Sequence, residues 1–194
     1  MVCVDRYLKG TDLDFVSLDN EKGGREITEY LLELGHHNIG CIFEPYCSSL
    51  DERFMGYKLA HEEKSISYQE DLIIWSEKKL EKKKKKGVYS LVESESDFSA
   101  IICSNDNVAI GAYNALTEKG YRVPEDVSLV GFSNSPVAKM LPVSLTTYKQ
   151  DPYQFGEVAA KLLINKINQE GNYQKSVKLE GELIKRDSTA VVNN

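Results

Sequence analysis

Short apolar runs alternate along this chain with segments whose apolar residues recur every three or four positions. The runs predict strands, and the spaced segments predict amphipathic helices. Strands are expected at residues 1–4, 15–18, 38–43, 72–75, 99–103 and 127–132, with a last strand near 179–185. Because helices of about 12 to 17 residues separate most of these strands, the pattern predicts parallel sheets in a layered α/β fold.

Polar residues mark where the predicted helices begin. Asp19-Asn20 and Asn105-Asp106 each precede a segment with helical spacing, as capping residues do. Ser49-Leu50-Asp51-Glu52 has the pattern of a capping box. Asp151-Pro152 opens a long helix with an apolar stripe. A further, lysine-rich helix is expected after the fourth strand.

Most of the predicted strands are followed at once by polar side chains. In a parallel sheet the carboxyl ends of the strands share one edge, where the ligands of open α/β folds bind. Amides and carboxylates can bridge adjacent hydroxyl groups, arginine can fix an orientation, and an indole ring can cover the apolar face of a sugar. The edge therefore predicts a site for a small polyol or sugar. Its candidate residues are Asp5, Ser49, Arg53, Trp75, Asn105, Asp106, Ser133 and Asn134.

Each candidate also has a purely structural interpretation. The one tryptophan is a core or rim residue in most proteins, and Asn105-Asp106 can serve as a helix cap alone. Arg53 can pair with Glu52 or Glu62 at the surface, and the segment from Ser133 to Pro136 can be an ordinary turn. The shared position of the candidates at strand ends, rather than any single residue, favours a binding site.

The composition of the 194 residues is globular, with 41% hydrophobic and 28% charged residues, and it excludes a disordered or fibrous chain. The net charge is −6, yet Glu77–Lys86 holds 7 of the 24 basic residues. The rest of the chain has 17 basic and 28 acidic residues, a net charge of −11, which disfavours general binding to a phosphate backbone. The Lys82–Lys86 run could be a nucleic-acid patch, but a solvated helix end is favoured because no aromatic residue or arginine is interleaved with it.

The sequence lacks the common motifs of catalysis and cofactor binding. The sequence has no phosphate-binding glycine loop, no H-E-x-x-H and no G-x-S-x-G, so neither an enzyme nor a cofactor is expected. The four cysteines form no C-x-x-C pair; Cys41 and Cys103 lie in apolar runs typical of buried, reduced thiols, and zinc is not expected with only three histidines. Because the sequence shows neither a membrane-length apolar run nor a secretory signal, we expect a cytoplasmic chain.

Two longer motifs carry a resemblance to a known family. The segments Ser104–Gly111 (SNDNVAIG) and Gly120–Phe132 (GYRVPEDVSLVGF) resemble the effector-binding domain of lactose-repressor and galactose-repressor (LacI/GalR) family regulators. Glu182–Thr189 is similar to the closing strand of this group, and of its arabinose-repressor branch in particular. Supporting motifs span nearly the whole chain: Val4-Asp5-Arg6, Asp19-Asn20, Gly23-Gly24, Gly35-His36, Arg53-x-x-Gly56-Tyr57, Leu145-Thr146-Thr147, Gln150 and Gly156.

The resemblance implies a type I periplasmic-binding-protein-like fold, with two parallel-sheet subdomains, a ligand between them and three crossovers as a hinge. By matching positions, residues 1–18 and 151–178 would be a remnant of the N-terminal subdomain, and residues 19–146 and 182–190 the C-terminal one. The crossovers would lie near residues 16–19, 146–151 and 178–182. Since such domains run to about 270 residues, we expect an incomplete N-terminal subdomain with an exposed sheet edge, and no DNA-binding head.

The resemblance also implies roles for the candidate residues. Arg53 and Asn105 match residues that family members use on the ligand, Trp75 matches an aromatic platform, and Asp5, Ser49 and Gln150 match secondary cleft positions. Many members have an aspartate after Gly-Phe, where this chain has Ser133. That departure, with Asn134 beside it, leaves the identity of the ligand open.

The implied function is an allosteric switch, in which a sugar-like effector bridges the subdomains and controls operator binding by a head outside these residues. The expected partners are the effector, a second copy of the chain and, through the head alone, operator DNA; no membrane partner is expected. Three alternatives remain open. The first is the sugar-binding protein of a transport system, which would need a signal peptide or a lipobox cysteine. The others are an enzyme on an α/β scaffold and a degenerate sensor that binds no ligand.

Overall fold

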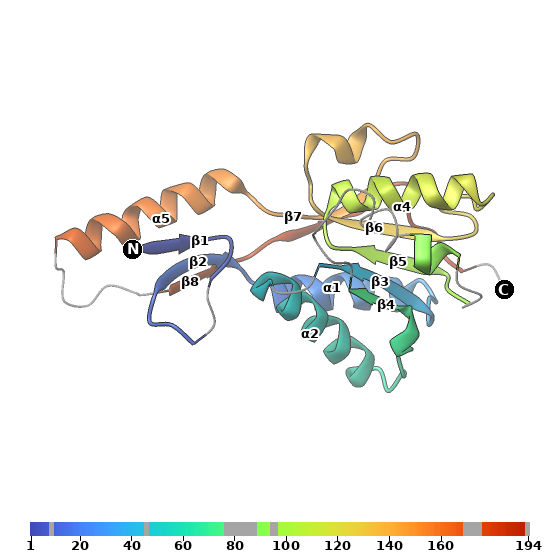
Figure 1. The fold of residues 1–194 in the computed structure, drawn as a ribbon, viewed down its shortest axis with the longest axis horizontal. Helices are drawn as coiled ribbons and strands as arrows, with labels where there is room; N and C mark the ends of the chain where they lie inside the picture. The colour runs from blue at the N-terminus through green and yellow to red at the C-terminus, as the bar shows by residue number, and fades with distance from the viewer. Residues whose placement is uncertain (8–9, 45–46, 76–88, 94–96, 169–175, 193–194) are drawn as a thin grey trace.

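The computed structural model describes residues 1–7, 10–44, 47–75, 89–93, 97–168 and 176–192, which form two lobes (Figure 1). The small lobe is a parallel three-stranded sheet, ordered β1-β2-β8, with helix α5 packed against β1 and β2. Its elements are β1 (Val2–Val4), β2 (Asp14–Leu18), β8 (Ser176–Leu179) and α5 (Pro152–Ile167).

The large lobe is built on a six-stranded sheet, ordered β4-β3-β5-β6-β7-β9. All neighbouring strands pair in parallel except β9, which runs antiparallel to β7 at the edge. The strands are β3 (Ile39–Phe43), β4 (Ile73–Trp75), β5 (Ala100–Cys103), β6 (Ser128–Ser133), β7 (Thr146–Lys149) and β9 (Glu182–Ile184). The helices are α1 (Asn20–Glu33), α2 (Ser48–Glu63) and α4 (Asp106–Glu118), with 3-10 turns at Glu70–Leu72 and Pro136–Lys139.

Helices cover both faces of the large sheet, which explains why its central strands are apolar throughout. Along β5, Ala100 and Ile102 join the apolar cluster under α1 and α2, whereas Ile101 and Cys103 join the cluster under α4. Helices α1 and α2 approach so closely that a Cβ at Gly56 would lie 2.0 Å from the Glu21 carbonyl oxygen. The small residues in these two helices therefore permit close packing.

The sequence predicted most of this architecture. The layered α/β class and the parallel sheets are confirmed, as are the strands before residue 135. Asp19, Asn105 and Asp151 cap helices α1, α4 and α5 by accepting backbone N–H groups of the first turn. Cys41 and Cys103 are buried free thiols, as predicted. The lysine-rich helix expected at residues 77–86 lies outside the described residues.

Two predictions from the sequence were wrong. The last strand, expected near residues 179–185, is two strands, because the chain leaves the small sheet after Leu179 and joins the large one at Glu182. Ser49-Leu50-Asp51-Glu52 is not a capping box, because α2 already begins at Ser48, with Cys47 as the N-cap and no side-chain cap bond. The Glu52 carboxylate bonds to other residues instead.

The chain passes between the lobes three times: from β2 to α1, from β7 to α5 and from β8 to β9. In Figure 1 these passages run side by side between the two lobes. The subdomain limits expected from the sequence, residues 1–18 with 151–178 and residues 19–146 with 182–190, stay a prediction.

The segment after β9 is fastened to the large lobe. The Leu129 amide donates to the Ser188 carbonyl oxygen at 2.7 Å, and the Val192 amide donates to the Leu34 carbonyl oxygen at 3.0 Å. The buried His36 ring lies between two partners, with Nδ1 2.9 Å from the Ser99 hydroxyl and Nε2 3.0 Å from the Ala190 carbonyl oxygen. Residues 188–192 thus complete the packing of α1, β5 and β6.

Candidate functional site

A polar cavity lies where the two lobes meet. The small lobe contributes the residues after β1, and the large lobe contributes the residues after β3, β5, β6 and β7 together with the first turns of α2. All of these positions are carboxyl ends of parallel strands or the helix that follows one, as expected for a ligand site in such a fold. The lining residues are Asp5, Arg6, Glu44, Ser49, Leu50, Arg53, Ser104, Asn105, Ser133 and Gln150.

Of the eight ligand-site residues expected once the resemblance is considered, the structure brings six together. Asp5, Ser49, Arg53, Asn105, Ser133 and Gln150 line the cavity, whereas Trp75 and Asn134 do not. Sequence reasoning missed Arg6, Glu44 and Ser104, although Glu44 and Ser104 directly follow strands and Arg6 is the second residue after β1, so the same rule would have found them. Leu50 is apolar and gave no such signal.

Arg53 lies at the base of the cavity with 8% of its surface exposed. Its Nε donates to Asn20 Oδ1 at 2.9 Å, its Nη1 donates to the Ser104 carbonyl oxygen at 2.7 Å, and its guanidinium carbon lies 3.3 Å from the centre of the Phe132 ring. These bonds and the ring fix the plane of the guanidinium. The interpretation of Arg53 as a surface partner of Glu52 or Glu62 was therefore wrong.

The charge of Arg53 is costly where it lies. Burial lowers the pKa of Arg53 to about 9, against the opposing effect of the Asp5 carboxylate. Among the described residues, both of its hydrogen-bond acceptors are neutral, and no carboxylate there is bonded to the cation. A ligand that offers hydroxyl or other acceptor oxygens at this cavity would stabilise the charged guanidinium.

Backbone conformation at the cavity departs from the usual regions at both lobes. Asp5 has φ of 68°, Ser133 has φ of 111° and Asn134 has φ of 53°. Positive φ is uncommon for residues other than glycine, and it clusters at ligand sites where the surrounding structure enforces it. The strand-end turns after β1 and β6 are therefore held in shape rather than relaxed.

The turn after β6 is held by Asp106. Its Oδ2 accepts from the Ser135 amide at 2.7 Å and the Ser135 hydroxyl at 2.8 Å, and its Oδ1 accepts from the Thr147 hydroxyl at 2.6 Å. A Cβ at Gly131 would lie 2.4 Å from Asp106 Oδ1, so glycine is required beside it. The sequence placed Asp106 in the site, but the structure gives it the task of supporting the turn that carries Ser133.

Gln150 and Asn134 differ in what they face. Gln150 lines the cavity and its Nε2 donates to the Ser133 hydroxyl at 3.2 Å, so the two side chains present a joint polar surface. Asn134 Oδ1 accepts a hydrogen bond from the Arg186 guanidinium, and the Asn134 backbone N–H donates to the Thr147 hydroxyl. Asn134 is thus engaged with the framework of the large lobe, in keeping with the turn interpretation.

Asn105 combines the two roles that the sequence left open. Its Oδ1 accepts from the Val108 amide at 3.0 Å and so caps α4. The same residue lines the cavity, and within the described part of the chain its Nδ2 makes one long contact, at 3.4 Å, with the Ser104 hydroxyl. The cap fixes the amide plane, and the Nδ2 group is left to donate to a ligand.

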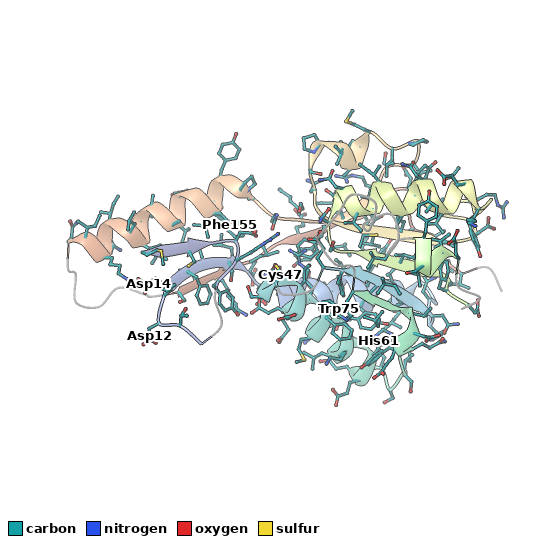
Figure 2. The ribbon with its side chains drawn as sticks, in the orientation of Figure 1. Asp12, Asp14, Cys47, His61, Trp75 and Phe155 are labelled. Carbon is teal, nitrogen blue, oxygen red and sulfur yellow. The ribbon has the colours of Figure 1, made fainter. Side chains whose placement is uncertain are left out.

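Trp75 ends the edge strand β4 with 37% of its surface exposed. Its ring lies 5.6 Å from the Phe43 ring and 5.5 Å from the Phe54 ring, and Figure 2 shows it on the α2 side of the large lobe. It packs as an aromatic rim residue, and its role as a sugar platform stays a prediction.

Two kinds of feature, a cluster of metal ligands and a membrane-length helix, are absent from the described residues. In residues 1–7, 10–44, 47–75, 89–93, 97–168 and 176–192, no group of three or more histidine, cysteine, aspartate or glutamate residues is placed to hold a metal ion. Within the same part of the chain, no helix has both the length and the apolar character that a bilayer crossing requires.

The two-lobed α/β fold with a polar cavity between the lobes defines a class of ligand-binding domain, and comparisons with known proteins identify the family. The model of the periplasmic binding protein-like domain matches residues 28–189, and the chain belongs to this family. Its relatives within the family are LacI-type transcription regulators. The regulator RegA of Clostridium saccharobutylicum is 32% identical over 190 residues, which cover 97% of this chain and 57% of RegA. The chain thus spans little more than half the length of such relatives.

Solved structures give the same result. The complex of the regulator CelR with cellobiose superimposes with a TM-score of 0.88 at 29% identity, covering 96% of this chain and 58% of that one. A LacI family regulator from Enterococcus faecium with bound ribose superimposes with a TM-score of 0.85 at 26% identity, covering 99% of this chain and 71% of that one. The similarity favours a regulator's effector domain over a transport binding protein.

The relatives do not select one branch of the family. Repressors named for the ribose operon and for arabinose metabolism match with 31% and 30% identity. The assignment to the arabinose-repressor branch therefore stays a prediction. The relatives named here are regulators of transcription rather than enzymes.

Proposed function

We propose that this chain is the sugar-sensing domain of a LacI-type transcriptional repressor and has no catalytic activity of its own. The observation that carries the proposal is the cavity between the lobes, where Asp5 and Arg6 of the small lobe face Arg53, Asn105 and Ser133 of the large lobe. A ligand that touches both sides binds one relative orientation of the lobes better than others. Such a ligand shifts the population of orientations.

The rest of the switch lies outside the cavity. We propose that a DNA-binding head outside these residues contacts operator DNA, that the chain works in the cytoplasm, and that it forms a homodimer. Leu163, Ile164 and Ile167 on α5 are 42%, 55% and 69% exposed, and they offer an apolar surface for a second copy. A coupling of about 1 to 3 kcal/mol between the effector and operator sites would change operator affinity from several-fold to about a hundredfold.

The experiment is a titration of the chain with D-ribose, L-arabinose, D-cellobiose and D-ribose 5-phosphate, followed by Trp75 fluorescence and by the melting temperature. We expect at least one of these sugars to raise the melting temperature in a saturable manner. If neither measurement responds to any of the four, the sugar-sensing proposal fails.

A pair of matched variants then places the ligand. Arg53→Lys should weaken binding of the responding sugar by about tenfold or more, because lysine cannot reproduce the planar donor fork. Arg122→Lys is the control, since Arg122 pairs with Asp126 at the surface of the large lobe. Equal affinities of the two variants would show that the sugar binds elsewhere.

A further inference from the structure

Glu52 of α2 connects the two lobes beside the cavity. Its Oε1 accepts from the Tyr7 hydroxyl at 2.8 Å and from Lys178 Nζ at 3.0 Å. Tyr7 follows β1 and Lys178 lies in β8, so both donors belong to the small lobe. The Glu52 side chain is only 12% exposed. One carboxylate of the large lobe thus holds two separate elements of the small lobe.

A second set of bonds joins Glu52 to the cavity. Asn20 Nδ2 donates to Glu52 Oε2 at 3.4 Å and to the Leu18 carbonyl oxygen at 3.0 Å, while Asn20 Oδ1 accepts from Arg53 Nε at 2.9 Å. Asn20 is 1% exposed and is the first residue of α1, directly after the passage from β2. The amide therefore links the cavity arginine, the passage and the Glu52 carboxylate.

Helix capping does not explain Glu52, since α2 begins before it and has no side-chain cap bond. Glu63 on the same helix shows what an ordinary glutamate does there, because it pairs with Arg25 within the large lobe and is 48% exposed. Glu52 differs by its burial and by the lobe to which its partners belong. The Tyr7 ring is itself held in place, stacked on Phe15 at 4.2 Å.

We infer that Glu52 is a positioning residue that holds the lobes in the observed orientation and, through Asn20, couples that orientation to what Arg53 binds. The coupling to a ligand rests on the proposed function, whereas the holding of the lobes does not. Glu52, Tyr7 and Lys178 touch no ligand in this scheme. They set the fraction of molecules whose cavity has both walls in place, and the apparent affinity falls with that fraction.

The Tyr7 phenol offers a direct signal of this contact. Burial, with the Glu52 hydrogen bond next in size, raises the pKa of Tyr7 to about 12. In Glu52→Gln the charge is gone while burial remains, so the pKa of Tyr7 should move part of the way back towards its ordinary value. The ring carbon signal of Tyr7, labelled with carbon-13 and followed by NMR through a pH titration, reports this shift.

The orientation of the two lobes relative to each other can be measured without any ligand. Spin labels at Glu125→Cys in the large lobe and Ala160→Cys in the small lobe, both exposed positions, are placed in a Cys3→Ser background. The distance distribution between them is recorded for wild type, Glu52→Gln and Tyr7→Phe, with Glu63→Gln as the matched control. We expect a broader distribution for Glu52→Gln, a smaller broadening for Tyr7→Phe and none for Glu63→Gln.

The outcomes separate the two proposals. If Glu52→Gln and Tyr7→Phe both give the wild-type distribution, Glu52 does not position the lobes and the inference is overturned. If none of the four sugars binds but the distributions broaden as expected, the proposed function fails and the positioning role stands. Where a sugar binds, Glu52→Gln should weaken it several-fold and the sugar should shift the Tyr7 signal in wild type. An unchanged affinity and an unmoved Tyr7 signal would overturn the coupling.

Discussion

The two lobes share one cavity but differ in how completely their apolar side chains are buried. The large lobe has helices on both faces of its sheet, and its largest side chains, such as Tyr57, Phe43 and Phe132, are at most 1% exposed. In the small lobe, Phe155 and Leu162 are the buried residues of α5, while Val4 of β1 is 47% exposed and Met1, just before β1, is 69% exposed. Figure 2 shows Phe155 between α5 and the three-stranded sheet.

This difference concerns the site as well as stability. Asp5 and Arg6 rest on the small lobe, whereas Arg53, Asn105 and Ser133 rest on the large lobe. Regions with few buried apolar contacts open at lower free energy than a well-packed core. We therefore expect the small-lobe wall of the cavity to move more easily than the large-lobe wall.

The largest test of the comparison uses one glycine from each lobe. Gly56→Ala would press a methyl group onto the α1 backbone and should destabilise the chain by about 3 kcal/mol, at the upper end for overpacking. Gly156→Ala, in α5, meets no atom within 4 Å and should stabilise it by about 0.5 to 1 kcal/mol through helix propensity. Urea unfolding followed by circular dichroism measures both. Equal effects would remove the contrast in packing.

A second test asks whether the small lobe opens alone. Leu162→Ala deletes a buried side chain of α5 and should cost about 2 kcal/mol, whereas Ile164→Ala at an exposed position of the same helix should cost much less. Because Trp75 reports on the large lobe, its fluorescence should persist in Leu162→Ala while part of the helical signal is lost. Coincident transitions by both probes would mean that the lobes unfold as one unit.

Acid should act on the large lobe through His36. Burial lowers the pKa of His36, so its neutral form is favoured in the folded state. The stability that this provides is present above the ordinary histidine pKa and is lost as pH falls through the lowered one. The melting temperature should drop by a few degrees between pH 7.5 and 5, and less so in His36→Gln. Burial lowers the pKa of His61 in the same way. His61→Gln is therefore measured beside His36→Gln, to show how much of the drop in melting temperature each buried imidazole causes.

The smallest effect is expected at the surface of the large lobe. Arg122 lowers the pKa of Asp126 to about 2 through hydrogen bonds, yet the pair is solvent-exposed. Exposed pairs contribute little because water and salt screen them. Asp126→Asn should leave the melting temperature unchanged at 0.15 M salt, and a clear drop would show that the large lobe depends on its surface as well as its core.

The sequence predicted the site to the extent that strand ends predict it. Asp5, Asn105 and Ser133 could be found because apolar runs end just before them and parallel strands end at one edge. The sequence could not show that Ser133 faces the cavity and Asn134 does not. The two residues are neighbours, and only the local turn decides which of them faces the cavity. The stacking of Trp75 on Phe43 and Phe54 could not be predicted either, because aromatic contacts of an edge strand leave no periodic signal in the sequence.

Long-range polar partners could not be predicted from the sequence, for another reason. Glu52 fits a capping pattern in the sequence, and its bonds to Tyr7 and Lys178 depend on segments 45 and 126 positions away. The split of the last strand was missed because two short strands close together in the sequence belong to different sheets, with a change of lobe between Leu179 and Glu182. Tertiary context, rather than local propensity, decides both.

The fastening of residues 188–192 onto β6 has a consequence for how the chain is made. Leu129 finds its hydrogen-bond partner at Ser188, so the large lobe cannot close its sheet until α5 and β8 have been synthesised in between. While α5 and β8 are being synthesised, the large lobe thus has five of its six strands, with β7 still lacking β9. A nascent chain stalled before residue 182 should therefore be the species most exposed to chaperones and to aggregation.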